Sequence, residues 1–320
     1  MSLKNFVRFL SLFLNRINEL IRFLFLFKSE DYRFLRFASP GHFYSPIPDF
    51  KEIQLNSKSL FNRSIRQILG INLNRNIQLN LAEEFIASYR DIPFTEYKND
   101  GRRYYYNNNF FSYGDVITLY SIMRLYKPRK IIEVGSGFSS AAMLDVNELF
   151  CDGQIQFNFI EPNPSRLQHL LLKKDLEKVN IIKKRVQEVS LETFNILKEN
   201  DILFIDSSHV AKTDSDVLHI CFNILPTLNE GVIIHFHDIL WPFEYPKLWY
   251  DQGRIWNEAY MLRAFLQFNT AFEIIYFNSF MELSQGEFLN THLPLMMKMP
   301  ESEETLGNTS LWIRKKLHDE

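Results

Sequence analysis

The stretch that decides the fold reads K-I-I-E-V-G-S-G-F-S-S, residues 130–140. Its first five residues suit a short strand, Gly135 and Gly137 favour a tight turn, and a helical pattern rich in alanine, methionine and leucine follows. Glycine lets the backbone turn sharply and approach a ligand closely, because no Cβ stands in the way. A strand, a glycine turn and a helix in this order predict the opening of a nucleotide-binding βαβ unit.

The residues around the two glycines indicate which nucleotide would bind. A dinucleotide fingerprint has a third glycine where Ser140 stands, and it places a pyrophosphate at the helix N-terminus. Here Glu133 lies two residues before Gly135, where its carboxylate would repel a pyrophosphate but would suit an ammonium and a sulfonium group. The pattern Glu-x-Gly-x-Gly after a first strand resembles the signature of class I S-adenosylmethionine (SAM) methyltransferases. The resemblance extends over roughly residues 110–315.

The resemblance assigns SAM contacts to individual residues. It implies that Glu133 to Gly137 cradle the methionine end of the cofactor and that Gln187 contacts the adenine. Glu161 ends a second strand, 24 positions after Gly137, and a carboxylate there accepts both ribose hydroxyls of an adenosine, in SAM and in NAD alike. The predicted cofactor-binding residues are Glu133, Gly135, Ser136, Gly137, Ser139, Glu161, Gln187 and Asp206.

From residue 130 onward, strand and helix patterns alternate, which predicts a parallel sheet with helices on both faces. The resemblance refines this fold class to an α/β, Rossmann-like seven-stranded methyltransferase sheet, mostly parallel with an antiparallel last strand. An N-terminal helical cap, 1–110, would cover the active-site edge of a SAM-binding domain, 111–320. The expected strands are 130–134, 155–160, 179–185, 201–206, 231–238, 272–277 and 310–314, and the expected helices include 77–90, 115–126, 165–177, 214–225 and 255–267.

Composition narrows the class of protein. With 320 residues, 46% of them hydrophobic and 23% charged, the chain is long and apolar enough for a folded domain with an elaborate cap. A net charge of −2 gives no electrostatic argument for a nucleic-acid partner, and the basic and aromatic run 102–106 is too short to supply one. Cys151 and Cys221 make no disulfide framework and fit a reducing, cytoplasmic location.

Residues 4–27 carry apolar positions at helical spacing. Charged residues at 8, 16, 19 and 22 argue against a bilayer-spanning helix, and no signal-peptide cleavage site follows. The segment therefore predicts an amphipathic helix. It would pack on its own domain or on a second copy in a homodimer, or it would lie on a membrane surface with its arginines at the headgroups.

Two motifs carry the candidate chemistry: 206–209 (DSSH) after the fourth strand and 235–238 (HFHD) at the end of the fifth. Ligands of open α/β sheets bind at the carboxyl edge of the strands, where the two motifs would lie side by side. Two carboxylates and up to three imidazoles would thus meet beside the methyl group of SAM. The predicted catalytic residues are Asp206, His209, His237 and Asp238.

One mechanism that fits these residues uses a metal. Asp206 and Asp238 would bind a divalent cation, Mg²⁺ or Mn²⁺, which holds a substrate hydroxyl and lowers its pKa. This arrangement resembles that of catechol-type O-methyltransferases. Ile239 departs from that family's pattern, which has a further polar ligand at this position.

A second mechanism uses a side chain as the base. His209 or His237 would remove the proton of the hydroxyl directly, with an aspartate orienting the imidazole. Lys212 is a third candidate base. Methyl transfer needs an aligned nucleophile, so positioning would supply much of the rate in either mechanism.

The segments 241–246 (WPFEYP) and 253–258 (GRIWNE) would form a substrate wall, with Arg254, Asn257 and Glu258 for polar recognition. The histidine motifs, the GFSS turn and 43–48 (FYSPIP) resemble bacterial methyltransferases near the cephalosporin-hydroxylase and macrolide-sugar enzymes. The sequence thus predicts a SAM-dependent methyltransferase that acts on a hydroxyl of a small molecule or a sugar. The alternatives are an NAD-dependent oxidoreductase on a similar core and a non-catalytic SAM-binding or membrane-tethered protein.

Overall fold

A computed structural model of the chain describes residues 17, 37–64, 67–175, 179–301 and 306–317. The chain divides into two compact units, Met1–Leu60 and Phe61–Glu320. In the first unit the structure describes two short helices, α2 (Phe50–Leu55) and α3 (Ser57–Leu60). Apart from residue 17, the amphipathic helix expected over 4–27 lies outside the described residues. Among the helices that are described, none is both long and apolar enough to cross a membrane.

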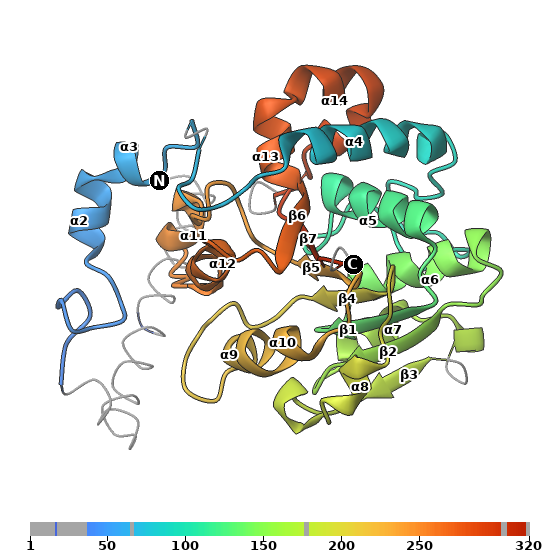
Figure 1. The fold of residues 1–320 in the computed structure, drawn as a ribbon, viewed down its shortest axis with the longest axis horizontal. Helices are drawn as coiled ribbons and strands as arrows, with labels where there is room; N and C mark the ends of the chain where they lie inside the picture. The colour runs from blue at the N-terminus through green and yellow to red at the C-terminus, as the bar shows by residue number, and fades with distance from the viewer. Residues whose placement is uncertain (1–16, 18–36, 65–66, 176–178, 302–305, 318–320) are drawn as a thin grey trace, which may run out of the picture. The chain divides into compact units, whose positions relative to one another are not determined.

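In the second unit, seven strands form one sheet in the order β3-β2-β1-β4-β5-β7-β6 (Figure 1). The strands β1 to β5 pair in parallel, and β7 runs antiparallel to both β5 and β6. This confirms the predicted Rossmann-like sheet, mostly parallel with an antiparallel last strand. The strands are β1 (Lys130–Val134), β2 (Gln156–Ile160), β3 (Asn180–Ile182), β4 (Ile202–Ile205), β5 (Ile233–Phe236), β6 (Phe272–Phe277) and β7 (Leu311–Lys315).

Every expected strand is present, and β1 has the predicted bounds. β4 and β5 are buried along their whole length, which explains why their sequences are apolar throughout and do not alternate. The strand expected over 179–185 is shorter. It ends at Ile182, because the N–H of Lys184 turns back to the carbonyl oxygen of Ile182 at 2.9 Å, and a 3-10 turn, η3 (Val186–Glu188), follows.

Helices cover both faces of the sheet, with α5 and α6 on one side and α9 and α10 on the other (Figure 1). The helix expected over 165–177 ends early, because the Asp175 carboxylate accepts the N–H of Leu172 at 2.7 Å and starts a separate turn, η2 (Lys173–Asp175). The helix expected over 214–225 contains a π-helical turn, η4 (Ile220–Ile224). The helices are α4 (Arg75–Tyr89), α5 (Tyr113–Tyr126), α6 (Phe138–Phe150), α7 (Ser165–Leu170), α8 (Glu192–Asn195), α9 (Asp216–His219), α10 (Leu225–Thr227), α11 (Lys247–Asp251), α12 (Glu258–Leu266), α13 (Asn278–Ser284) and α14 (Gly286–His292).

The register of the parallel strands aligns the residues that follow them. Val134 at the end of β1 lies beside Ile205 at the end of β4, which lies beside Phe236 at the end of β5. The ladder hydrogen bonds continue one residue further on β4 and β5, with N···O distances of 2.8 and 2.9 Å. Three neighbouring loops therefore begin with a row of residues at one edge of the sheet: Gly135, Asp206 and His237.

The segment before α5 is tied to α6 and η2 by an ion network around a buried arginine. Arg103 is 4% exposed and pairs with Asp145 at 2.8 Å, Asp175 at 2.6 Å and Glu148 at 2.9 Å. The adjacent Tyr104 is fully buried, so this basic and aromatic run is part of the core and does not form a base-stacking surface. The separate cap domain over residues 1–110 stays a prediction.

Candidate active site

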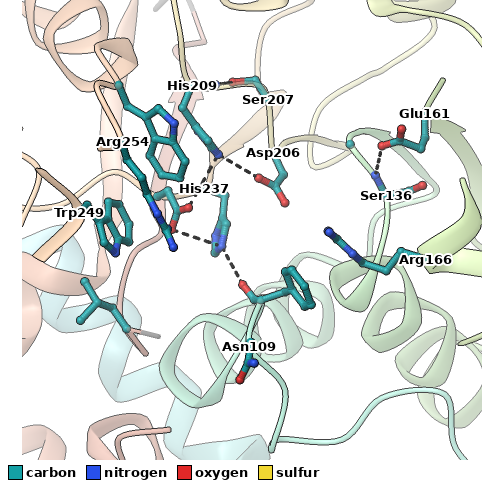
Figure 2. Close-up of a pocket in the computed structure, with 15 residues that line it drawn as sticks. Asn109, Ser136, Glu161, Arg166, Asp206, Ser207, His209, His237, Trp249 and Arg254 are labelled. Atoms are coloured by element: carbon teal, nitrogen blue, oxygen red, sulfur yellow. Dashed lines mark hydrogen bonds and ion pairs between the residues drawn. The ribbon is translucent and has the colours of Figure 1, made fainter. Parts of the chain in front are cut away.

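A cavity of about 490 Å³ lies at the carboxyl edge of β1, β4 and β5. Figure 2 shows side chains from these strand ends and from neighbouring loops converging on it. All four predicted catalytic residues line the cavity, together with some of the predicted cofactor residues. The lining residues are Asn109, Phe110, Gly135, Ser136, Glu161, Arg166, Asp206, Ser207, His209, His237, Asp238, Trp249, Arg254, Trp256 and Leu306.

Two of these residues have a left-handed backbone conformation, which residues other than glycine rarely adopt. The φ angle is 60° at His209 and 56° at Asp238. Such a conformation costs roughly 1–2 kcal/mol and persists only where the surroundings fix it. The carbonyl oxygen of His209 accepts the N–H groups of Asn257 at 3.0 Å and Glu258 at 3.2 Å, which holds this loop against the start of α12.

His209 lies among three carboxylates. Its Nδ1 is 2.9 Å from Oε2 of Glu258, and its Nε2 is 3.4 Å from Oδ1 of Asp206 and 3.8 Å from Oδ2 of Asp238. Burial alone would lower the pKa of His209, but the hydrogen bonds to Asp206 and Glu258 and the surrounding negative charge raise it well above its usual value. Both ring nitrogens therefore act as donors, and the side chain is an imidazolium near neutral pH.

His237 is less fully engaged. Its Nε2 is 3.1 Å from the carbonyl oxygen of Phe110 and 3.6 Å from Oδ1 of Asp238, and its buried Nδ1 has no hydrogen-bond partner among the described residues (Figure 2). Burial would lower the pKa of His237, but the charges of Asp238, Asp206 and Asp115 raise it above its usual value. His237 and Asp238 thus form a pair of neighbouring side chains at the end of β5.

Asp206 completes the charged row. Burial would raise the pKa of Asp206, but the hydrogen bond from His209 and the charges of His237, His209 and Arg166 together lower it. Asp206 is therefore ionised at neutral pH, with 35% of its side chain exposed.

His235, the third imidazole of the motifs, belongs to the core. It is fully buried, its ring stacks on that of Phe204 at 3.7 Å, and its Nε2 is 2.9 Å from Oγ of Ser310. Burial and the positive charge of His237 hold the pKa of His235 well below its usual value. It is not among the residues that line the cavity.

The geometry gives poor support for a metal between Asp206 and Asp238. The two carboxylates face a cation of the protein itself, Nε2 of His209, at 3.4 and 3.8 Å. Within the ranges that the structure describes, no group of three or more His, Cys, Asp or Glu residues is arranged to hold a metal ion. Ile239, at the position of the further ligand, is fully buried and apolar. The metal assignment stays a prediction, and these residues do not fit it well.

The profile of a family described as a methyltransferase domain matches residues 132–239. The matched range runs from β1 to the residue after Asp238, so it includes the glycine turn, Glu161 and both histidine motifs. This chain is a class I SAM-dependent methyltransferase. The mostly parallel sheet with its antiparallel last strand is the one that the resemblance implies, and the predicted cofactor is SAM.

Comparison with known proteins finds chains that are similar to this one. An uncharacterised protein of Archaeoglobus fulgidus is 37% identical over 201 residues, which are 60% of this chain and 89% of the archaeal one, and the two chains belong to one family. A structure of CmcI with Mg and SAM is 18% identical and covers 63% of this chain and 72% of its own, with a TM-score of 0.36. The O-methyltransferase TomG from Streptomyces achromogenes, in complex with SAM, is 10% identical and covers 83% and 96%, with a TM-score of 0.39.

The glycine turn of this methyltransferase packs closely against the backbone that follows β4. Gly135 has φ 83°, and a Cβ there would lie 2.0 Å from the carbonyl oxygen of Asp206. The following residue, Ser136, carries a buried hydroxyl that has no partner in the described part of the chain. A Cβ at Gly137 would lie 3.0 Å from Cδ of Arg166, so a side chain there would crowd this arginine.

Glu133 fixes this turn from behind. It is fully buried, and its two carboxyl oxygens accept the hydroxyls of Ser139 and Ser140 in the first turn of α6. Burial raises the pKa of Glu133 to about 8, although the serine hydrogen bonds oppose this shift. Neither Glu133 nor Ser139 lines the cavity, so their predicted contacts with SAM stay predictions.

Glu161 stands where the cavity joins a second one of about 430 Å³. Its carboxylate accepts the N–H of Ser136 at 3.3 Å and that of Asn163 at 2.8 Å. The second cavity is also lined by Gln187, whose amide donates to the carbonyl oxygen of Asp214 at 2.7 Å. Lys212 lines this second cavity and not the one that holds the histidines.

The predicted substrate wall is partly present. Arg254 and Trp256 line the cavity, whereas Glu258 holds His209, and the Asn257 side chain accepts the N–H of Ala211 at 2.6 Å. Sequence reasoning missed several lining residues. One signal was available, because a cation at the first turn of a helix, as Arg166 is in α7, opposes the helix dipole. The missed residues are Asn109, Phe110, Arg166, Trp249 and Leu306.

Proposed function

We propose that this methyltransferase transfers the methyl group of SAM to a hydroxyl oxygen of a small molecule or a sugar. The observation that carries the proposal is the His237–Asp238 pair at the end of β5. Oδ1 of Asp238 is 3.6 Å from Nε2 of His237, and Oδ2 is 3.8 Å from Nε2 of His209. Both distances are too long for a hydrogen bond from these imidazoles. The Asp238 carboxylate can therefore accept a hydrogen bond from the hydroxyl of the acceptor.

The two joined cavities support a place for SAM, which supplies an electrophilic methyl group when it is bound. They share the lining residues Gly135, Glu161, Asp206 and Ser207. The second cavity would take the adenosine, with Glu161 accepting from the ribose hydroxyls. The first cavity would take the methionine end, with the backbone of the glycine turn beside it. The guanidinium of Arg166, which lies 3.8 Å from the centre of the Phe110 ring, would face the methionine carboxylate.

The acceptor hydroxyl would lose its proton to the His237–Asp238 pair. A positioned acid–base group of this kind contributes roughly 10²–10⁴-fold to a rate. His209 would have a different role, because carboxylates already take both of its ring nitrogens. Its positive charge holds Asp206 and Asp238 near each other and keeps the negative charge at this edge of the sheet balanced.

The proposal uses no divalent cation. Mg²⁺ binds oxygen ligands at about 2.1 Å in near-octahedral geometry. A metal between Asp206 and Asp238 would have to displace the His209 imidazolium, which Glu258 holds from the other side at 2.9 Å. The protein's own cation thus supplies the charge balance between the two carboxylates.

The test is methyl transfer with purified protein, SAM and a panel of hydroxylated sugars and small aromatic compounds. The expected product carries the new methyl group on oxygen, located by NMR, with S-adenosylhomocysteine formed in equal amount. Asp238→Asn and His237→Asn should lower kcat by roughly 10²–10⁴-fold while SAM still binds. Asp251→Asn is the matched control, because that exposed carboxylate pairs with Lys247 outside the cavity.

Methylation of nitrogen or carbon by the unaltered protein would overturn the assignment to hydroxyl acceptors. Full activity of both the His237 and the Asp238 variant would be compatible with O-methylation, but it would show that this pair is not the base. Binding of SAM is measured separately by calorimetry, so that a variant that fails to hold the cofactor is not mistaken for one that has lost its base.

A further inference from the structure

Across the cavity from the glycine turn lies Arg254, a positive group that the reaction itself does not use (Figure 2). Its guanidinium carbon is 5.2 Å from the centre of the Trp249 ring and 5.3 Å from that of Trp256. In the described part of the chain, no ion pair or hydrogen bond engages this guanidinium. Arginine carries five N–H donors in a planar fork that matches carboxylate and phosphate, so a lone guanidinium in a cavity suits an anionic ligand.

The backbone holds Arg254 in this place. The helix α11 ends in a left-handed turn at Gly253, with φ 79°. The N–H of Gly253 donates to the carbonyl of Tyr250 at 2.9 Å, and the N–H of Arg254 donates to that of Trp249 at 2.9 Å. These two bonds form a Schellman motif, which commonly brings the residues at its two ends into side-chain contact. The stacking of Arg254 on Trp249 is that contact, so the guanidinium is positioned before any ligand arrives.

Trp249 adds an independent sign of a missing hydrogen-bond acceptor. The residue is 3% exposed and lines the cavity, and its indole Nε1 is buried without a hydrogen-bond partner among the described residues. A buried donor left without an acceptor is costly, and a ligand that binds beside it is one ordinary explanation. An anion beside Arg254 and Trp249 would accept hydrogen bonds from both side chains.

The charged side chains of the cavity favour one position for such an anion. Asp206 and Asp238 line the part of the cavity near the strand ends and would repel it. Arg166 stacks on Phe110 and lies against Gly137, so it belongs to the cofactor end. Among the described residues that line the cavity, Arg254 is then the arginine that remains for the acceptor.

We infer that the acceptor carries, besides the hydroxyl that is methylated, a carboxylate or a phosphate that Arg254 and Trp249 bind. The inference rests on the proposed function, because it names the acceptor class of the same site. With the anion held at Arg254, the other end of the acceptor would reach the His237–Asp238 pair.

Matched probes test this inference by binding, without need of turnover. The protein is saturated with S-adenosylhomocysteine and titrated calorimetrically with glucuronate against glucose, and with 4-hydroxybenzoate against 4-hydroxybenzamide. Glucose 6-phosphate distinguishes phosphate from carboxylate. A charge-assisted pair with arginine predicts that the better anionic probe binds roughly tenfold to a hundredfold more tightly than its neutral partner. Arg254→Gln should abolish this preference, and Arg254→Lys should restore part of it.

Arg124→Gln is the control, because Arg124 also stacks on an aromatic ring, that of Phe150 at 4.2 Å, but lies on α5 outside the cavity. Its anion preference should equal that of the unaltered protein. Charged probes that bind no better than neutral ones, including a panel in which nothing binds, overturn the inference. So does a preference that survives in a folded Arg254→Gln variant. Methyl transfer to neutral probes alone would leave the proposed function intact, whereas anion preference with methylation on nitrogen would overturn only the proposed function.

Discussion

The charge on His209 can be tested through its buried partner, Glu258. This glutamate is 1% exposed; one carboxyl oxygen is 2.9 Å from Nδ1 of His209, and the other accepts the hydroxyl of Ser207 at 2.9 Å. Glu258→Gln keeps the size of the side chain and removes its negative charge. The perturbation therefore leaves a buried imidazolium with one counter-charge fewer.

The expected loss of stability is about 2–4 kcal/mol at acidic and neutral pH. A hydrogen bond to a charged group contributes roughly 1.5–3 kcal/mol, and breaking a buried ion pair costs roughly 3–5 kcal/mol, which the retained shape of glutamine reduces. The pKa of His209 is raised in the folded protein, so its stabilising effect is complete below its unfolded-state pKa of about 6.5. The effect is lost as the pH rises through the folded-state pKa. For each pH unit by which Glu258→Gln lowers the folded-state pKa of His209, the loss of unfolding free energy should be about 1.4 kcal/mol smaller at high pH than at low pH.

The assay is urea unfolding of both proteins at about pH 6 and about pH 9.5, where the difference in unfolding free energy should shrink. Glu273→Gln provides the control. Glu273 accepts two bonds from Arg314, at 2.9 and 2.6 Å, and arginine keeps its charge throughout this range. The decrease in unfolding free energy caused by Glu273→Gln should therefore not depend on pH. A loss for Glu258→Gln that is constant, or that grows with pH, would refute the imidazolium assignment for His209.

Three further outcomes follow from the site. Gly135→Ala should lower the free energy of unfolding and weaken SAM binding at least about tenfold, as measured by urea unfolding and calorimetry. Gly153→Ala is the control, because Gly153 has φ 69° and no atom within 4 Å of an added Cβ. It should cost only the backbone strain of roughly 1–2 kcal/mol. Glu161→Gln should weaken SAM binding by roughly tenfold to a hundredfold in the same titration, with little change in melting temperature. Dialysis against EDTA should leave methyl transfer unchanged; a loss that Mg²⁺ restores would show that His209 moves aside for a metal.

Much of the fold was predictable because its signals are local. β1 is an apolar run bounded by a lysine and a glycine, and its observed bounds, Lys130–Val134, are the predicted ones. The row formed by Gly135, Asp206 and His237 could also be expected, since parallel strands end at one edge. The π-helical turn at Ile220–Ile224 could not, because such turns are rare and no residue type marks them in the sequence.

The roles of the two histidines were not predictable from their own motifs. His209 and His237 each lie near an aspartate in the sequence. The difference arises from Glu258, 49 positions after His209, which takes Nδ1 of that ring. Trp249 reaches the cavity from a segment without a chemical motif, so only the packing of α11 reveals it.

The two cations that flank the catalytic carboxylates differ in what neutralises them. His209 lies among Asp206, Asp238 and Glu258, so these carboxylates of the protein neutralise its positive charge. Among the described residues, Arg254 contacts the faces of Trp249 and Trp256, which orient a guanidinium but do not neutralise it. A bound anion is the group that completes this second arrangement. A site built in this way selects its acceptor by charge at one end and deprotonates it at the other, so loss of Arg254 should raise KM far more than it lowers kcat.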